Sequence, residues 1–152
     1  MKVGAKVPDL RLPQSDGSEW RLADHAGRKV VLYFYPKDMT PGCTLEGQDF
    51  RRLHAAFARA RTAVFGISRD SCASHARFRE REGFPFELLS DADERACRLF
   101  DVIREKNMYG RKVLGIERST FLIDPAGKLV REWRKVKVQG HAEEVLEEAK
   151  HH

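Results

Sequence analysis

The pattern of hydrophobic and polar residues predicts strands and helices that alternate along the first half of the chain. Residues 30–35 and 62–68 form two short runs that are almost entirely apolar. Such runs are typical of strands covered on both faces, so residues 30–35 are expected to form a central strand. Apolar residues then recur at helical spacing from residue 41 to about residue 60, and a second helix is expected between Ser71 and Gly83. This order predicts two parallel strands whose carboxyl ends lie at one edge of a sheet.

The remaining segments predict a hairpin near each end of the chain. Residues 8–26 contain two short apolar stretches around a turn at residues 15–18, which favours an N-terminal hairpin. A second hairpin is expected from strands at residues 119–123 and 129–138, joined by a turn. The other expected elements are a brief edge strand at 86–90, a short helix at 93–100, a loop at 107–115 and a final helix at 140–150.

Together these elements predict an α/β protein with a thioredoxin-like fold. Helices flank a mixed central sheet, and the N-terminal β-hairpin is an extension of it. We assign residues 1–152 to a single domain, because a chain of this length can bury its own core and contains no repeat or linker. The closing His151 and His152 are either native or the remnant of a purification tag, and they receive no functional role.

Composition narrows the range of partners. The chain carries 28 Lys and Arg against 23 Asp and Glu, a net charge of +5, but the two kinds of charge are interspersed. Because basic patches mark nucleic-acid binding better than net charge does, we expect no nucleic-acid partner. No apolar run is long enough to span a bilayer, so we expect no membrane association. An odd number of cysteines, 3, does not suit a secreted disulfide framework and favours a reducing, cytoplasmic location.

The most informative stretch is residues 36–46, between the first apolar run and the helix that follows it. Cys43 falls in the first turn of that helix. Backbone N–H groups at a helix N-terminus lack partners within the helix, and together with the helix dipole they stabilise a negatively charged sulfur. Taken alone, a cysteine at this place is more often a small buried hydrophobe than a nucleophile. The residues around it therefore decide between the two interpretations.

The spacing of Pro36, Thr40 and Cys43 resembles the active-site pattern of the peroxiredoxins. The longer string at residues 33–44 is similar to the bacterioferritin-comigratory, or Q-type, branch of that family. Further motifs similar to those of the branch follow in the same order at residues 66–71, 88–91 and 117–124. Several separated motifs in one order are more specific than a lone cysteine motif.

The resemblance extends from about Val7 to Leu146 and implies a thiol peroxidase that reduces hydrogen peroxide and organic hydroperoxides without metal, haem or flavin. The Cys43 thiolate attacks the peroxide and becomes a sulfenic acid. Arg118 is carried over as the guanidinium that holds both the sulfur and a peroxide oxygen. The implied reductant is thioredoxin or another thiol, and the protein is expected to be a monomer or to associate weakly.

Four further residues receive roles at this site. The hydroxyl of Thr40 is expected beside the thiolate and the peroxide, and the ring of Pro36 shields the pocket from water. The backbone N–H groups of Gly42 and of the cysteine itself are oxyanion-hole donors. Glu46, one helical turn after the cysteine, is placed to orient the arginine.

The sequence departs from the family pattern in its second cysteine. Many Q-type peroxiredoxins carry a resolving cysteine at one of two positions, which here hold Gln48 and Arg79. Cys72 starts the same helix as Arg79, roughly 10 Å upstream at 1.5 Å per residue. A disulfide needs Cα atoms within about 7 Å, so the first turn around Cys43 would have to unwind. A two-cysteine cycle through Cys72 and a one-cysteine cycle with an external thiol both remain open.

Other classes of protein remain as alternatives. A thioredoxin-fold disulfide reductase usually needs a Cys-x-x-Cys motif, whereas position 46 holds Glu46. A thioredoxin-like binding or chaperone module would leave Cys43 unreactive. Cys72 and His75 have a spacing that zinc sites use, with Cys43 and His54 as further ligands, but this spacing is common by chance and we expect no metal site.

The other candidates receive structural roles. Cys97, in the short helix, is expected to pack in the core. His54 is interpreted as a residue at the boundary of the core, and His141 as a local cap or surface group. The alternating residues 135–138 are typical of a half-buried strand with one solvated side.

Overall fold

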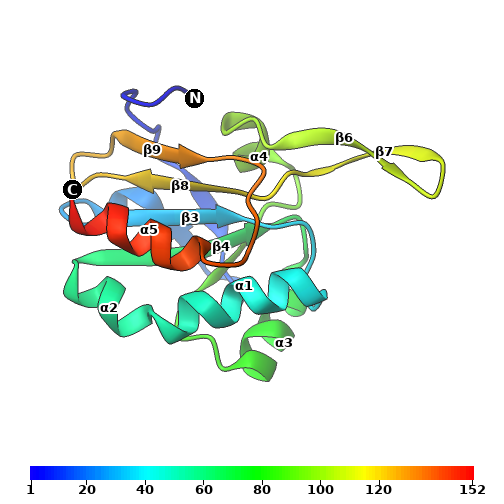
Figure 1. Cartoon of the computed structure of the whole chain (residues 1–152), viewed down its shortest axis with the longest axis horizontal. Helices are drawn as coiled ribbons and strands as arrows, with labels where there is room; N and C mark the ends of the chain where they lie inside the picture. Colours follow the sequence, from blue (N-terminus) through cyan, green and yellow to red (C-terminus); the bar gives the residue numbers. More distant parts are fainter.

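A computed structural model describes residues 1–152 and contains one central sheet of five strands in the order β5-β4-β3-β8-β9. These strands are β3 (Lys29–Phe34), β4 (Thr62–Ser68), β5 (Leu88–Ser90), β8 (Ser119–Ile123) and β9 (Leu129–Trp133). The pairs β3 with β4 and β4 with β5 are parallel, whereas β8 runs antiparallel to both β3 and β9. The sheet is therefore mixed with β3 at its centre, as the thioredoxin-like prediction requires (Figure 1).

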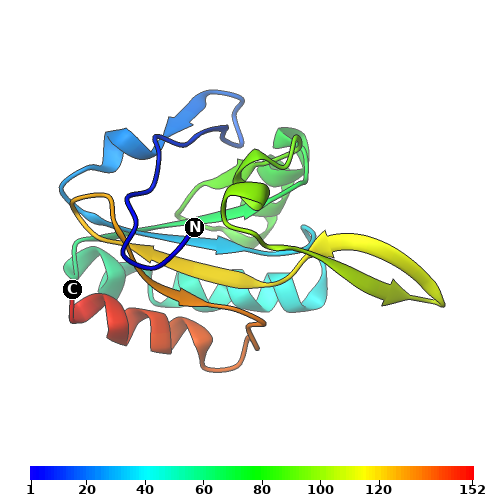
Figure 2. The same cartoon turned by 90° about the horizontal axis from the view of Figure 1, so that it is seen from above.

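The helices are α1 (Pro41–Arg52), α2 (His54–Arg59), α3 (Cys72–Glu82), α4 (Arg95–Leu99) and α5 (His141–Lys150). The N-terminal hairpin consists of β1 (Arg11–Pro13) and β2 (Glu19–Arg21), and a 3-10 helix, η1 (Leu22–His25), follows it. Figure 2 shows α1 and α5 on one face of the sheet, with the hairpin and α4 on the other. No helix has the length and apolar character needed to cross a membrane.

The sheet separates two hydrophobic cores, which explains why the sequence of β3 is apolar at successive positions. Val31 and Tyr33 pack with residues of α1, α2, α3 and α5. Leu32 and Phe34 point to the other face, where they pack with the N-terminal hairpin and α4. Side chains alternate between the faces of a strand, so a strand covered on both sides needs apolar residues throughout.

The helix α3 confirms the predicted boundaries. Ser71 caps its start, because its side chain accepts a hydrogen bond from the backbone N–H of Ser74 at 3.1 Å. Gly83 ends it in the left-handed conformation, with φ of 65°. The neighbouring helix α1 packs closely on the segment after α3, since a Cβ at Gly47 would lie 2.3 Å from the ring of Phe84.

Three predictions about local structure are wrong. The expected loop at 107–115 belongs to a hairpin of β6 (Ile103–Met108) and β7 (Arg111–Ile116), which extends from the body of the protein (Figure 1). Tyr109 and Gly110 at its tip have φ of 53° and 79° and form a two-residue turn. Such turns are usually recognised in a sequence by the pair Asn-Gly, so the pair Tyr-Gly did not indicate one. The mostly exposed strands also lack a buried apolar face.

The other two errors concern where elements end. The long helix expected to reach residue 60 breaks at Leu53, whose ψ of 3° leaves the helical region and separates α1 from α2. The strand expected to reach residue 138 ends at Trp133. Lys135 has φ of 50°, which a strand cannot accommodate, so the alternation at 135–138 does not form a half-buried strand.

Candidate active site

The candidate site lies at the edge of the sheet where β3 ends and β8 begins. The loop after β3 leads to Cys43 in the first turn of α1, while Arg118 directly precedes β8. Because Phe34 at the end of β3 pairs with Ser119 at the start of β8, the two segments meet at this edge. The topology thus brings together two residues that are 75 positions apart.

A single guanidinium joins a sulfur and a carboxylate at this edge. Nη2 of Arg118 donates to Sγ of Cys43 at 3.4 Å, and Nη1 donates to Oε1 of Glu46 at 2.6 Å. Cys43 is 2% exposed and Glu46 is 1% exposed, whereas the side chain of Arg118 is 16% exposed. The predicted association of these three residues is therefore present in the structure.

The start of α1 adds backbone donors on the same side. The N–H groups of Gly42 and Cys43 donate to no group within the chain. A Cβ at Gly42 would lie 3.2 Å from Nη2 of Arg118, so a larger residue would push against the guanidinium. Unpaired N–H groups at a helix N-terminus favour negative charge beside them.

Burial sets the ionisation of the carboxyl and of the guanidinium. Burial raises the pKa of Glu46 from 4.5 to about 7, although Arg118 opposes the shift. The second oxygen of Glu46, Oε2, is buried and has no hydrogen-bond partner. Burial opposes the charge of Arg118, but Glu46 and the Cys43 sulfur together raise the pKa of this guanidinium above its ordinary value, so it is a permanent cation.

The loop before α1 places the other predicted residues. Thr40 precedes the helix, and its hydroxyl donates to the carbonyl oxygen of Lys37 at 2.8 Å. Because this hydroxyl hydrogen already bonds to a carbonyl of the loop, only the hydroxyl oxygen is available, as an acceptor. Pro36 is half-buried in the same loop.

Lys106 brings a second positive charge toward the site from β6. Its Nζ donates to the carbonyl oxygen of Ile116 at 2.5 Å. Burial and then the charge of Arg118 lower the pKa of Lys106, while the Cys43 sulfur acts in the opposite direction. Lys106 could not be recognised from the sequence, because part of the hairpin that carries it was predicted to be a loop.

The other two cysteines differ in their surroundings. Cys72 is half-buried at the first residue of α3, and none of the three cysteines is in a disulfide. Cys97 is fully buried, and burial followed by Asp91 raises the pKa of its thiol well above the ordinary range, which agrees with a packing role. At the family's second-cysteine position, the guanidinium of Arg79 donates to Glu87 at 2.9 Å.

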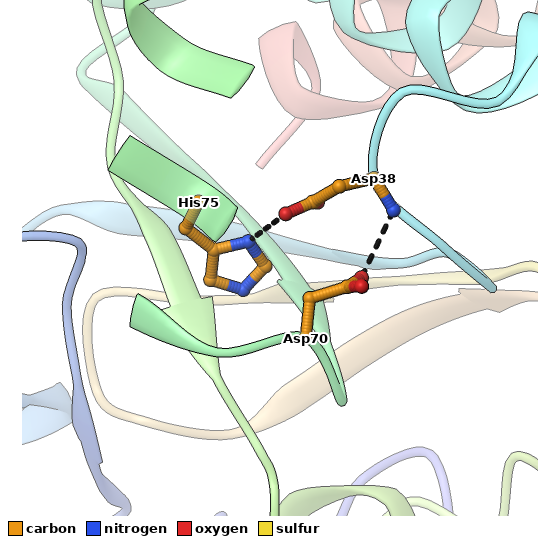
Figure 3. Close-up of side chains that lie close together, drawn as sticks. All are labelled: Asp38, Asp70 and His75. Atoms are coloured by element: carbon orange, nitrogen blue, oxygen red, sulfur yellow. Dashed lines mark hydrogen bonds and ion pairs between the residues drawn. The ribbon is translucent and has the colours of Figure 1, made fainter. Parts of the chain in front are cut away.

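A network of polar side chains lies behind the loop and was also missed. His75 of α3 is fully buried, with Nδ1 2.7 Å from Oδ2 of Asp38 and Nε2 3.0 Å from the carbonyl oxygen of Leu89 (Figure 3). The backbone N–H of Asp38 donates to Asp70 at 2.9 Å. Potential metal-binding atoms of Asp38, Asp70 and His75 lie within 4.8 Å of one another, but both ring nitrogens of His75 already face partners within the fold.

The predicted role of His141 is corrected by the structure. His141 is 5% exposed, and its Nε2 lies 2.8 Å from Oγ1 of Thr120, so it is a core residue and not a surface group. Burial lowers the pKa of His141 to about 4, which keeps the ring neutral at physiological pH. His54 is half-buried, as expected for a residue at the boundary of the core.

Comparison with known proteins agrees with this geometry. The family model described as the AhpC/TSA family matches residues 3–132. The chain is 55% identical over 152 residues to Peroxiredoxin Bcp of Xanthomonas campestris pv. campestris, covering 100% of this chain and 95% of the relative. It is 47% identical over 150 residues to Peroxiredoxin Bcp of Bacillus subtilis, covering 99% and 96%.

Solved structures agree as well. A structure of the Xanthomonas campestris bacterioferritin comigratory protein, from work on its alkyl peroxide reduction activity, has a TM-score of 0.92 and 53% identity, covering 99% of each chain. A mutant of PrxQ from Xylella fastidiosa has a TM-score of 0.95 and 47% identity, covering 100% of this chain and 97% of the other.

The fold and the cysteine-arginine pair define a class of thioredoxin-like proteins with one buried, cation-bound sulfur. This chain belongs to the AhpC/TSA family and, within it, to the bacterioferritin-comigratory, Q-type branch of the peroxiredoxins. The resemblance drawn from the sequence is confirmed, and the alternative of a binding or chaperone module is not favoured.

The raised pKa of Glu46 makes the stability of the folded protein depend on pH. The folded protein holds the carboxyl proton more tightly than the unfolded chain does, so this stabilisation is complete below pH 4.5 and is lost as the pH rises to about 7. Over this interval we expect the unfolding free energy of the wild type to fall by about 3 kcal/mol more than that of the variant Glu46→Gln.

The measurement is urea unfolding at a series of pH values. The matched control is Glu80→Gln, which changes an exposed glutamate of α3 and should follow the wild type. A Glu46→Gln variant whose stability varies with pH just as the wild type's does would contradict this assignment.

Proposed function

We propose that this chain is a thiol-dependent peroxidase in which the thiolate of Cys43 reduces hydrogen peroxide and organic hydroperoxides. The observation that carries the proposal is the contact of 3.4 Å between Nη2 of Arg118 and the buried sulfur. A cation and unpaired N–H groups around one sulfur favour the thiolate, which is the reactive form. The alkyl peroxide reduction activity described for the similar Xanthomonas campestris protein supports the same substrate class.

The reaction is a displacement on oxygen. A lone pair of the Cys43 sulfur attacks one peroxide oxygen, so that an S–O bond forms while the O–O bond breaks. The sulfur is oxidised to a sulfenic acid, and the leaving oxygen departs as hydroxide or alkoxide and takes up a proton to give water or an alcohol. Negative charge therefore moves from the sulfur to the departing oxygen.

Arg118 is placed to stabilise that negative charge both on the sulfur and on the departing oxygen. Its planar guanidinium already contacts the sulfur and has further N–H groups for a peroxide oxygen. Donors fixed at the place where charge develops stabilise the transition state more than the ground state. Glu46 holds the other side of the guanidinium at 2.6 Å, so it acts as a positioning residue for Arg118.

The loop and the helix start would orient the peroxide. Because the hydroxyl hydrogen of Thr40 is bound by Lys37, its oxygen is available to accept the peroxide O–H. The free N–H groups of Gly42 and Cys43 would add donors for the developing charge. Pro36 offers no N–H group, and its ring limits access of water to the pocket.

We assign the regeneration step to an external thiol, with thioredoxin as the expected reductant. The thiol condenses with the sulfenic acid, which releases water and forms a disulfide, and a second thiol then reduces that disulfide. A reducing, cytoplasmic compartment suits this cycle because it keeps thiols reduced, and we expect the protein to act as a monomer. The alternative cycle uses Cys72 as the resolving thiol.

The proposed nucleophile can be tested by substitution. In the variant Cys43→Ser, thiol-dependent peroxide consumption should fall to background, because serine offers a hydroxyl that stays protonated at neutral pH in place of the thiolate. The measurement is peroxide loss in the presence of a thiol reductant, and a metal chelator should leave the wild-type rate unchanged. The matched control is Cys72→Ser, which should oxidise as fast as the wild type in a single turnover. Peroxide consumption that survives in Cys43→Ser would refute the proposal.

The fate of the sulfenic acid is tested separately. After one equivalent of peroxide, we expect a dimedone adduct on Cys43 with Cys72 still free, because Cys72 lies in the first turn of a hydrogen-bonded helix. Non-reducing peptide mass spectrometry reads both residues at once. A peptide that links Cys43 to Cys72 would replace the external-thiol route with the two-cysteine cycle.

A further inference from the structure

The buried network behind the active-site loop connects that loop to α3. Asp38 lies in the loop between β3 and α1, and its side chain is 2% exposed. His75 and Ser74 of α3 both bind Oδ2 of Asp38, at 2.7 Å and 2.8 Å. The hydroxyl of Tyr35, directly after β3, donates to Oδ1 of Asp38 at 2.6 Å. Two elements that are distant in sequence are thus held by one carboxyl group (Figure 3).

The hydrogen-bond partners of His75 indicate which of its ring nitrogens carry hydrogens. Its Nε2 faces the carbonyl oxygen of Leu89, and a carbonyl can only accept, so Nε2 carries a hydrogen. Its Nδ1 faces Asp38, whose two oxygens already accept hydrogen bonds from Tyr35 and Ser74. Donors on both oxygens favour the ionised carboxylate, and opposite an ionised Asp38 the Nδ1 atom carries a hydrogen as well.

The charged surroundings favour the same state. A second carboxylate, that of Asp70, lies within 4.8 Å of the potential ligand atoms of Asp38 and His75. Two carboxylates around one buried imidazole favour a proton on the ring over a proton on either acid. The ring is fully buried, and burial by itself disfavours a charge, so a cation at this place depends on these carboxylates.

We propose that His75 is a buried imidazolium whose ion pair with Asp38 holds the active-site loop, which makes His75 a positioning residue for the peroxidase reaction. This inference rests on the proposed function. No contact joins His75 to the sulfur of Cys43, so the effect is transmitted through the loop. The pair does not take part in the displacement itself.

The conformation of the loop explains why such a restraint is needed. Met39, next to Asp38, has φ of 63°, which is unfavourable for a residue with a long side chain. Strained backbone persists only where its surroundings hold it. The backbone N–H of Asp38 binds Asp70, and the hydroxyl of Thr40 binds Lys37. Release of the ion pair would let Met39 relax and would move Thr40 and the first turn of α1.

The protonation state can be measured directly in the unmodified protein. In the reduced protein labelled with ¹⁵N-histidine, at neutral pH, we expect both ring nitrogens of His75 to carry hydrogens. His141 is an internal comparison, because its ring is neutral and carries a single hydrogen. A His75 ring with only one protonated nitrogen would overturn the inference. This measurement needs neither peroxide nor a variant, so its outcome is separate from that of the proposed function.

The positioning role is tested with the variants His75→Asn and Asp38→Asn. In each we expect the rate constant of Cys43 oxidation by peroxide to fall by about 10- to 100-fold, since small displacements of reacting groups have effects of that size. Amide exchange of residues 37–40 should become at least about tenfold faster. The matched control is His54→Asn, which changes a half-buried histidine of α2 away from the loop.

The double variant, with both His75→Asn and Asp38→Asn, tests whether the two residues act as a pair or independently. A lone buried charge is more costly than none, so the double variant should lose less than the product of the two single losses. Single variants that fold and react with peroxide as fast as His54→Asn would refute the positioning role. A wild type that does not consume peroxide would refute the proposed function, while amide exchange would still test the ion pair.

Discussion

The guanidinium of Arg118 is shared between a buried sulfur and a buried carboxyl group, and the active-site edge of the fold is arranged around this sharing. A mostly buried cation needs partners, and Cys43 and Glu46 supply them at 3.4 Å and 2.6 Å. The partners come from one turn of α1, whereas the cation comes from the start of β8. Only a sheet in which β3 and β8 are neighbours brings them together. The chemistry of the site is therefore a consequence of strand order.

Two restraints act on the two sides of the same cysteine. On one side, Arg118 fixes the sulfur and is itself fixed by Glu46. On the other, the loop that leads into α1 is held by Asp38 and His75. Each restraint is a hydrogen bond between buried groups, at least one of which is charged, and such bonds are costly to break. The site thus gains rigidity for the displacement on oxygen.

Much of this could be predicted from the sequence, where the signal is local. Apolar runs identified β3 and β4, and the motif around Cys43 identified Arg118 as its partner through a family resemblance. Features that depend on distant contacts could not be predicted. The β6–β7 hairpin lacks a buried face and a recognisable turn, so it resembled a loop. His75 resembled a chance zinc ligand because its partner, Asp38, is 37 positions away.

We propose that Arg118 stabilises the transition state of peroxide reduction and does not merely make the sulfur reactive. The most direct test compares two reactions of Cys43 in a Cys72→Ser background, with and without Arg118→Gln: oxidation by hydrogen peroxide and alkylation by iodoacetamide. We predict that the substitution slows oxidation by at least about 100-fold and alkylation by no more than about tenfold, because only peroxide places developing charge on an oxygen beside the guanidinium. Equal losses in the two reactions, or no loss in either, would rule out this role of Arg118.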